Sequence, residues 1–337
     1  MKLLVTGGAG FIGSNFIHYM LGKYSGVQIV NFDALTYAGN LENLASVEKD
    51  GRYSFFKGDI ASRENVRAVF KSQSFDAVVH FAAESHVDRS LLDPEPFILT
   101  NILGTQRLLD ACRESAVPRF VHVSTDEVYG SLGREGSFTE ETPVQPNSPY
   151  AASKASSDFM VRAAVKSHGL NAVITRCSNN FGPYQFPEKL IPLMIANAME
   201  DKPLPVYGDG LYVRDWIYVL DHCRGVDVVL RKGKSGEIYN IGGLHDVPNI
   251  EVIRMLLKLL DKPESLIQYV NDRPGHDRRY AMDTTKIREE LGWKPEFDFG
   301  TALGQTVDWY RSSRSWLEGV RSGAYQDYYR KMYGSRL

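Results

Sequence analysis

KLLVTGGAGFIGS, at residues 2–14, is the strongest indication of the fold in this chain. A short apolar run leads into glycines spaced GxxGxxG, and a helix-periodic stretch follows them. Gly7 permits a tight turn, Gly10 lets the backbone approach a pyrophosphate, and Gly13 lets the helix pack closely on the strand. The N-terminus of such a helix also favours phosphate charge. The stretch therefore predicts a strand, a turn and a helix that together bind a dinucleotide.

The alternation of short apolar runs and helical patterns continues through the first half of the chain. It predicts right-handed crossovers and an α/β fold with a doubly wound parallel (Rossmann) sheet, which we place at residues 1–177. Prolines and glycines then interrupt the alternation of apolar runs and helical patterns. At 178–337 we therefore expect mainly a smaller C-terminal substrate-binding lobe, with some segments returning to the sheet. The expected strands lie at 3–6, 28–32, 53–56, 77–81, 120–124 and 172–176, the expected helices at about 11–22, 62–73, 95–115 and 149–168, and the later elements at 215–232, 238–241 and 249–260.

The bulk composition is that of an ordinary globular protein. Of the 337 residues 24% are charged and the formal net charge is −2, which argues against binding to nucleic acid or to a membrane surface. Three widely spaced cysteines without a CxxC pair predict buried free thiols, and dispersed histidines predict no metal site. Because the chain begins directly in a strand and has no apolar run of membrane-spanning length, we expect a cytoplasmic protein without a signal peptide.

Asp33 indicates which dinucleotide the chain binds. It ends the second expected strand, 20 residues after Gly13, where a carboxylate accepts the adenosine ribose hydroxyls and repels a 2′-phosphate. The position favours NAD over NADP, although an aspartate there can also be a simple strand-end cap. Asp59 follows the third strand, where it can reach the adenine or, equally, lie in the N-cap region of the next helix.

Further motifs resemble a known family. They are HFAAESHVDRS at 80–90, STDEVYG at 124–130, YAASK at 150–154, RCSNNFGPYQFPEKLIPL at 176–193, PVYGDGLYVRDWIYVLDHC at 205–223 and DRPGHDRRYAMD at 272–283. With TGGAGFIGS at 6–14 and GDI at 58–60, they resemble extended short-chain dehydrogenase/reductases of the nucleotide-sugar branch, and within it the dTDP-glucose 4,6-dehydratase family. The glycine and YxxxK motifs identify only the superfamily, whereas the Thr-Asp-Glu triplet is far more discriminating. One departure is Leu220, where the family usually has an acidic residue.

The resemblance implies a lyase that converts dTDP-glucose to dTDP-4-keto-6-deoxyglucose and water, with NAD regenerated in each cycle. Tyr150 and Lys154 are four residues apart, so both project from one face of the expected helix. A lysine ammonium and a positive nicotinamide ring would favour a phenolate, although the pKa of a tyrosine is ordinarily about 10. Tyr150 would then take the proton of the carbon-4 hydroxyl while hydride leaves carbon 4 for NAD⁺.

Elimination of water needs a second pair of groups. Asp126 and Glu127 are two carboxyl groups whose proximity can split their protonation states. The resemblance assigns Glu127 as the base at carbon 5, Asp126 as the acid that protonates the carbon-6 hydroxyl, and Thr125 as the hydrogen-bond donor to the carbon-4 oxygen. The alternative is that the two carboxylates only cap the loop after the fifth strand.

The resemblance also assigns the binding residues. Arg214 and Arg273 suit a diphosphate and Tyr207 a nucleobase, although each, taken singly, is more often part of an ordinary surface ion pair. The expected NAD contacts are Gly7, Gly10, Phe11, Ile12, Gly13, Asp33, Ala34, Leu35, Thr36, Asp59, Ile60, Phe81, Ala82, Ala83, Thr100 and Asn180. The expected substrate contacts are Ser85, Asn179, Lys189, Leu190, Pro205, Tyr207, Arg214, Asn249, Arg273 and His276.

Three other functions stay open. A UDP-sugar 4,6-dehydratase differs only in loops that recognise the base. A nucleotide-sugar 4-epimerase is disfavoured by Asp126-Glu127, because epimerases of this branch usually carry small or apolar residues there. A non-catalytic NAD-binding protein is disfavoured by the intact Thr125, Tyr150 and Lys154. Helices at 95–115 and 149–168 match those of a four-helix dimer interface in this superfamily, so the resemblance implies a homodimer.

Overall fold

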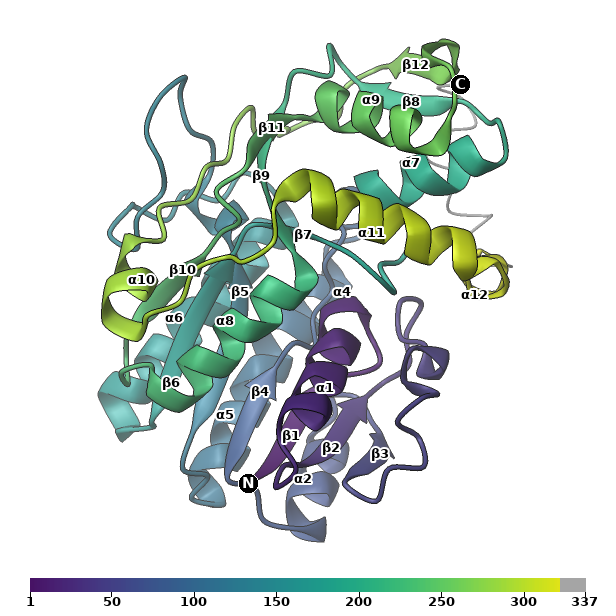
Figure 1. Ribbon diagram of the computed structural model, residues 1–337. Coiled ribbons are helices and arrows are strands. Elements are labelled where there is room, and N and C mark those ends of the chain that lie inside the picture. Colours follow the sequence, from purple (N-terminus) through teal and green to yellow (C-terminus); the bar gives the residue numbers. More distant parts are fainter. Residues whose placement is uncertain (322–337) are drawn as a thin grey trace.

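Seven parallel strands form the expected sheet, in the order β10-β6-β5-β4-β1-β2-β3 (Figure 1). The structure is a computed structural model that describes residues 1–321, so the end of the second expected domain, 322–337, lies outside the described residues. The strand order reverses beside β1, whose neighbours are β2 and β4, and doubly wound sheets bind ligands at such a reversal. The strands are β1 Lys2–Thr6, β2 Gln28–Asp33, β3 Tyr53–Lys57, β4 Ala77–His80, β5 Phe120–Thr125, β6 Ala172–Cys177 and β10 Ile238–Ile241.

Helices cover both faces of the sheet. Leu3 and Val5 of β1 pack into one core with side chains of α1 and α8, whereas Leu4 packs on the opposite face with α2, α5 and α6, because successive side chains of a strand point to opposite faces. The first six expected strands are confirmed to within one residue. The helices are α1 Phe11–Lys23, α2 Arg63–Ser72, α3 Val87–Leu92, α4 Glu95–Phe97, α5 Thr105–Glu114, α6 Pro149–His168 and α8 Val219–Lys232.

The helix α6, which carries Tyr150 and Lys154, has the bounds that the sequence predicts. Ser148 is its N-cap and accepts a hydrogen bond from the Ala151 amide at 3.1 Å. Pro149 occupies the first position, where its missing N–H costs nothing. Gly169 ends the helix in the left-handed conformation, with φ of 67°.

Two expected elements are divided in the structure. The helix expected at 95–115 consists of α4, a π-helical stretch η2 (Ile98–Gly104) and α5. The segment 215–232 begins as a strand, β9 (Val213–Tyr218), and becomes helical only in α8. Residues 213–218 form a strand because they pair with two other strands, β7 and β11, on either side of β9. Pairing of this kind is a tertiary effect that local periodicity does not contain.

The C-terminal lobe lies above the carboxyl edge of the main sheet (Figure 1). It holds a three-stranded sheet, β11-β9-β7, and a parallel pair, β12-β8, while α8 and β10 return to the main sheet. No helix within residues 1–321 is long and apolar enough to cross a membrane. The remaining elements are β7 Asn179–Phe181, β8 Leu204–Tyr207, β11 Asp246–Pro248, β12 Ile267–Val270, α7 Leu190–Met199, α9 Asn249–Leu260, α10 Thr285–Leu291, α11 Phe299–Ser312, α12 Arg314–Val320, and the 3₁₀ turns η1 Leu41–Leu44, η3 Asp126–Tyr129 and η4 Glu264–Leu266.

Candidate active site

A cavity of about 340 Å³ lies at the carboxyl edge of the main sheet. Its lining includes the five expected catalytic residues and all of the expected NAD contacts except Leu35. Four of the expected substrate contacts also line it, namely Ser85, Asn179, Lys189 and Leu190. Residues that are far apart in the sequence thus meet at the place where the strand order reverses.

The glycine turn between β1 and α1 is closely packed. Gly7 has a φ of +70°, and a Cβ atom on it would lie 2.5 Å from the Ala82 amide nitrogen. A Cβ atom on Gly13 would lie 2.2 Å from the Gly7 carbonyl oxygen, whereas one on Gly10 would approach that oxygen only to 3.3 Å. Gly7 and Gly13 are therefore required by the protein's own packing. Gly10 faces a less crowded space, as a residue that lies against a pyrophosphate should.

The Asp33 carboxylate is held in place by the backbone around it. Its Oδ2 accepts a hydrogen bond from the Ala9 amide at 2.9 Å and its Oδ1 accepts one from the Leu35 amide at 2.8 Å. Burial raises the pKa of Asp33, while these two N–H groups oppose the rise. Leu35 does not line the cavity, so in this structure it acts on the site through its backbone amide.

Asp59 lines the cavity but also belongs to a turn. Its Oδ1 accepts a hydrogen bond from the Ala61 amide at 2.7 Å. The N-cap of α2 is Ser62, not Asp59. The carboxylate thus shapes the turn before α2 and also borders the cavity, and its contact with adenine stays a prediction.

Thr125 organises the two neighbouring carboxyl groups. It ends β5 and is the N-cap of η3, where its Oγ1 accepts a hydrogen bond from the Glu127 amide at 3.3 Å. The same hydroxyl donates to Asp126 Oδ1 at 3.2 Å. Because Thr125 supplies the cap, the alternative in which Asp126 and Glu127 serve only as caps does not describe this turn. Both carboxyl groups instead line the cavity.

Asp126 and Glu127 experience different charges. Burial raises the pKa of Asp126 well above its ordinary value, and the charges of Glu127 and Asp215 raise it further. Burial also raises the pKa of Glu127, but Lys189, Arg273 and Arg214 all oppose that rise. The pair is thus arranged so that Asp126 retains a proton while Glu127 ionises more readily.

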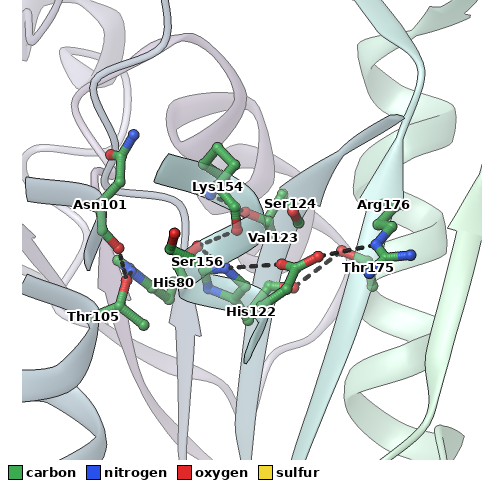
Figure 2. Close-up of polar contacts among 12 residues, drawn as sticks. His80, Asn101, Thr105, His122, Val123, Ser124, Lys154, Ser156, Thr175 and Arg176 are labelled. Carbon is green, nitrogen blue, oxygen red and sulfur yellow. Dashed lines mark hydrogen bonds and ion pairs between the residues drawn. The ribbon is translucent and has the colours of Figure 1, made fainter. Parts of the chain in front are cut away.

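Tyr150 and Lys154 lie side by side on the buried face of α6. Lys154 donates a hydrogen bond from Nζ to the Val123 carbonyl oxygen at 2.8 Å (Figure 2). Burial lowers the pKa of this lysine to about 8, and Asp158 and Cys177 oppose the fall. Burial raises the pKa of Tyr150 well above its ordinary value, and the charge of Glu127 adds to the rise. Tyr150 therefore needs positive charge beside it in order to act as a base.

The remaining expected substrate residues lie in a second polar cluster. Asp88 holds two of them, since Arg273 Nη1 lies 2.7 Å from its Oδ1 and the Tyr207 hydroxyl donates to its Oδ2 at 3.0 Å. His276 stacks on Tyr212 with ring centroids 3.7 Å apart. This cluster does not line the 340 Å³ cavity. The expected substrate residues outside that lining are Pro205, Tyr207, Arg214, Asn249, Arg273 and His276.

The cavity has further lining residues that the sequence did not single out. Gln185 Oε1 and Ser124 Oγ are buried and have no hydrogen-bond partner among the described residues, and the same holds for Asn179 Oδ1 among the expected contacts. Unpaired buried polar atoms are costly unless a ligand satisfies them. Ser124 and Gln185 lie inside the motifs at 124–130 and 176–193, so their place in those motifs was the sequence signal that could have identified them as lining residues. The additional lining residues include Glu84, Ser124, Cys177, Ser178, Gln185, Phe186, Glu188 and Trp216.

Comparisons with known proteins agree with the geometry. Residues 4–306 match the family model described as GDP-mannose 4,6 dehydratase. A dTDP-glucose 4,6-dehydratase of Xanthomonas campestris pv. campestris (strain B100) is 53% identical over 341 residues, which cover 96% of this chain and 97% of the relative. The crystal structure of DesIV, a dTDP-glucose 4,6-dehydratase from Streptomyces venezuelae with NAD bound, is 50% identical with a TM-score of 0.92, covering 95% of this chain and all of that one (100%).

An enzyme with a different reaction shares the fold at lower identity. The UDP-glucose 4-epimerase of Thermus thermophilus, solved with NAD, has a TM-score of 0.86 and 32% identity. It covers 93% of this chain and 100% of its own. The fold alone therefore does not distinguish dehydration from epimerisation, and the side chains of the site must do so.

Proposed function

The chain belongs to the GDP-mannose 4,6-dehydratase family, and we propose that it is a NAD-dependent lyase that converts dTDP-glucose to dTDP-4-keto-6-deoxyglucose and water. The observation that carries this proposal is the Asp126-Glu127 pair, which lies in the same cavity as Tyr150 and Lys154. An enzyme that only oxidises and reduces carbon 4 has no use for a protonated carboxyl group beside an ionised one. An enzyme that also expels water needs both.

The cavity fits NAD. The crowded glycine turn, the preorganised Asp33 carboxylate and the unpaired polar atoms of the lining suit a pyrophosphate, a ribose with free hydroxyls and a nicotinamide. When bound, NAD accepts hydride from carbon 4 of the sugar and returns it to carbon 6. Asp33 would hold the adenosine ribose, and Lys154 and Asn180 would lie at the nicotinamide end.

Tyr150, Lys154 and Thr125 serve the oxidation of carbon 4. Tyr150 takes the proton from the carbon-4 hydroxyl. The Lys154 ammonium lowers the cost of the phenolate that Tyr150 needs for this step. Thr125 ends β5 beside the carboxyl pair, and its hydroxyl can donate to the oxygen on carbon 4. The resulting ketone acidifies the proton on carbon 5.

Glu127 and Asp126 serve the elimination. Glu127 takes the carbon-5 proton, and Asp126 gives its proton to the carbon-6 hydroxyl, which leaves as water. The carbon-5 proton is restored when carbon 6 is reduced. The proton count closes when Tyr150 releases the proton it took and Asp126 regains one, both by exchange with water. Each proton transfer by a positioned carboxyl group contributes about 10²–10⁴-fold in rate. Burial raises the pKa of both groups, but nearby carboxyl groups add to the rise at Asp126 whereas nearby cations oppose it at Glu127, and this difference matches the two roles.

The substrate's nucleoside diphosphate matches the cationic side chains near Glu127. Lys189, Arg214 and Arg273 all act electrostatically on that carboxyl group. Guanidinium groups bind phosphate oxygens in a fixed geometry. Asp88 fixes Arg273 through an ion pair, so the guanidinium is oriented in advance.

The reaction is tested by incubating the purified protein with dTDP-glucose in deuterated water and analysing the product by mass spectrometry. We expect loss of one water and incorporation of one deuterium at carbon 5. An isomer of unchanged mass would instead establish epimerisation. Turnover of UDP-glucose but not of dTDP-glucose would show that the substrate carries uracil and not thymine. Binding of NAD without any product would show that the protein only binds the cofactor.

We further propose that the protein forms a homodimer. Exposed apolar side chains gather on α3, η2 and α6, which contact one another. They are Leu91, Leu92, Ile98, Leu99, Leu103 and Phe159. Apolar patches of this kind on adjacent helices mark protein interfaces. A second copy is the partner that we propose, since the patch residues on η2 and α6 lie within the stretches 95–115 and 149–168 that are expected to pair.

We also propose that the protein works in the cytoplasm. Cys112, Cys177 and Cys223 are buried and free, as expected from the sequence and as suits a reducing compartment. Recovery of the activity in an extracellular or membrane fraction of the source cells would contradict this location.

A further inference from the structure

A third functional side chain lies on the same face of α6 as Tyr150 and Lys154. Asp158 follows Lys154 by four residues, just as Lys154 follows Tyr150. Residues at this spacing lie above one another on a helix. The three residues are 7%, 4% and 2% exposed along the row. Asp158 does not line the cavity and has no role in the chemistry above.

Asp158 belongs to a buried polar network beneath the site. Its Oδ2 accepts a hydrogen bond from Arg176 Nε at 2.9 Å, and its Oδ1 lies 3.5 Å from His122 Nε2 without a hydrogen bond. His122 and Arg176 come from the neighbouring strands β5 and β6 (Figure 2). The carboxylate therefore joins α6 to β6 through Arg176 and lies close to His122 of β5.

The network returns to Lys154 through the backbone. His122 Nε2 lies within hydrogen-bond distance of Ser157 Oγ, at 3.0 Å, and Ser157 donates to the Lys154 carbonyl oxygen at 2.7 Å. Lys154 itself donates to the Val123 carbonyl of β5. The Lys154 carbonyl oxygen and the Lys154 ammonium are thus each held by a hydrogen bond, the former through Ser157, which also lies within hydrogen-bond distance of His122.

The other titratable groups beside Lys154 carry no compensating charge. Burial lowers the pKa of His80 on β4 to about 3 and the pKa of His122 on β5 well below its ordinary value, so both rings are neutral. Burial raises the pKa of the Cys177 thiol on β6 to about 12. Tyr150 is the neighbour on the cavity side. Among the carboxyl groups, Asp158 has the largest effect on Lys154.

We propose that Asp158 is a positioning residue for the dehydratase reaction: held by Arg176, it supplies the buried negative charge that keeps Lys154 an ammonium and keeps it directed at Tyr150. A buried ammonium without a counter-charge gives up its proton, because burial disfavours the charged form. The neutral amine would then no longer favour the Tyr150 phenolate. The inference rests on the proposed function, since it assigns a residue to the same reaction.

The test replaces the ion pair by neutral groups of similar shape, in the variant Asp158→Asn/Arg176→Gln. This change leaves no unpaired buried charge, which protects the fold. Arg176 is not among the groups that shift the pKa of Lys154, so the double variant still removes the counter-charge. The measurement is kcat as a function of pH, through the range in which Lys154 loses its proton.

We expect the alkaline fall of kcat to move to lower pH by about 1 unit, the shift that a nearby opposite charge produces. Asp158→Glu retains the charge and should retain the wild-type position of that fall. The matched control is Asp227→Asn/Arg231→Gln, which neutralises a second ion pair with a buried aspartate, on α8. It should lower the melting temperature without moving the pH profile.

A wild-type pH profile in the folded double variant would overturn the proposal and leave Asp158 a purely structural residue. Equal shifts in Asp158→Glu and in the double variant would overturn it as well. Asp158→Asn alone is the second variant, and it must show the same displacement. Wild-type protein assayed alongside separates the two hypotheses, because failure of the proposed function abolishes its turnover, whereas failure of this inference leaves that turnover intact.

Discussion

Asp126 and Glu127 are consecutive residues with the same chemical group, yet the structure prepares them for opposite tasks. Asp126 is buried beside a second carboxyl group, Asp215, and has a hydroxyl as its one hydrogen-bond donor. Glu127 lies among three cations. The difference arises from chain segments that are distant in sequence, so the residue type alone does not assign the acid and the base.

Asp126→Asn should separate oxidation from dehydration. The amide keeps the shape of the side chain but has no proton to give to the carbon-6 hydroxyl. We expect kcat for dehydration to fall by about 10²–10⁴-fold, while the enzyme still oxidises carbon 4. The measurement is the absorbance of enzyme-bound reduced nicotinamide after mixing with dTDP-glucose, which should rise and persist.

Glu127→Gln is the matched control for that variant. It should also accumulate reduced nicotinamide, but it should fail to exchange the carbon-5 proton with deuterated solvent, whereas Asp126→Asn should still exchange it. Identical exchange behaviour in the two variants would contradict the assignment of acid and base.

At the scale of elements, the β1–α1 unit shows how a short motif can specify a site. The turn between them is crowded at Gly7 and Gly13 by the protein's own backbone and is less crowded at Gly10. The position of α6 has a similar local origin, because Ser148, Pro149 and Gly169 fix its ends. Elements with such strong boundary signals appear where the sequence predicts them.

Gly13→Ala should disrupt this unit even without a ligand. The added methyl group would meet the Gly7 carbonyl oxygen at 2.2 Å, and overpacking of this kind costs about 1–3 kcal/mol. Gly22→Ala on the same helix meets nothing within 4 Å and should stabilise the protein by about 0.5–1 kcal/mol. Thermal unfolding and the NAD content of the purified variants measure both effects.

A Gly13→Ala protein with wild-type stability and full NAD content would show that the turn is less rigid than its packing indicates. Destabilisation by Gly22→Ala would mean that a partner covers that part of α1.

At the scale of the whole molecule, exposed apolar side chains on α3, η2 and α6 form the proposed dimer interface. These elements lie on the sheet face opposite α1 and α8. Phe159, which is 51% exposed, directly follows the buried Asp158 on α6. The outer face of this helix therefore carries part of the proposed interface, and its inner face carries Tyr150, Lys154 and Asp158. Dimer formation would therefore also brace the helix that holds Lys154.

Leu99→Glu/Phe159→Glu should convert the proposed dimer to a monomer. Two buried charges facing their symmetry mates cost more than the patch can supply. Light scattering after size-exclusion chromatography gives the mass directly. Leu259→Glu, which changes an exposed leucine on α9 instead, is the control and should leave the mass unchanged. A wild-type protein that elutes as a monomer would refute the homodimer.

From the sequence alone we could predict the sheet and the cofactor turn, and could name the residues proposed for catalysis, which the structure brings together in one cavity. Their signals are local: glycines that only a tight turn tolerates, helix caps, and apolar runs of a length that fits a buried strand. Apart from Leu35, every residue expected at the NAD end of the cavity lines it. The same local signals failed where neighbours decide, as at β9, which pairs with β7 and β11 and is not the start of a helix.

The charges that surround Asp126 and Glu127, and the pairing of Asp158 with Arg176 beneath the site, could be seen only in the folded protein. Each of these depends on distances between segments separated by many residues, such as Asp158 on α6 and Arg176 on β6. The physical reason is that protonation and hydrogen bonding respond to burial and to charges within a few ångströms. The sequence specifies which titratable side chains are present, and the packing of the fold determines the burial and the neighbouring charges that shift their pKa values.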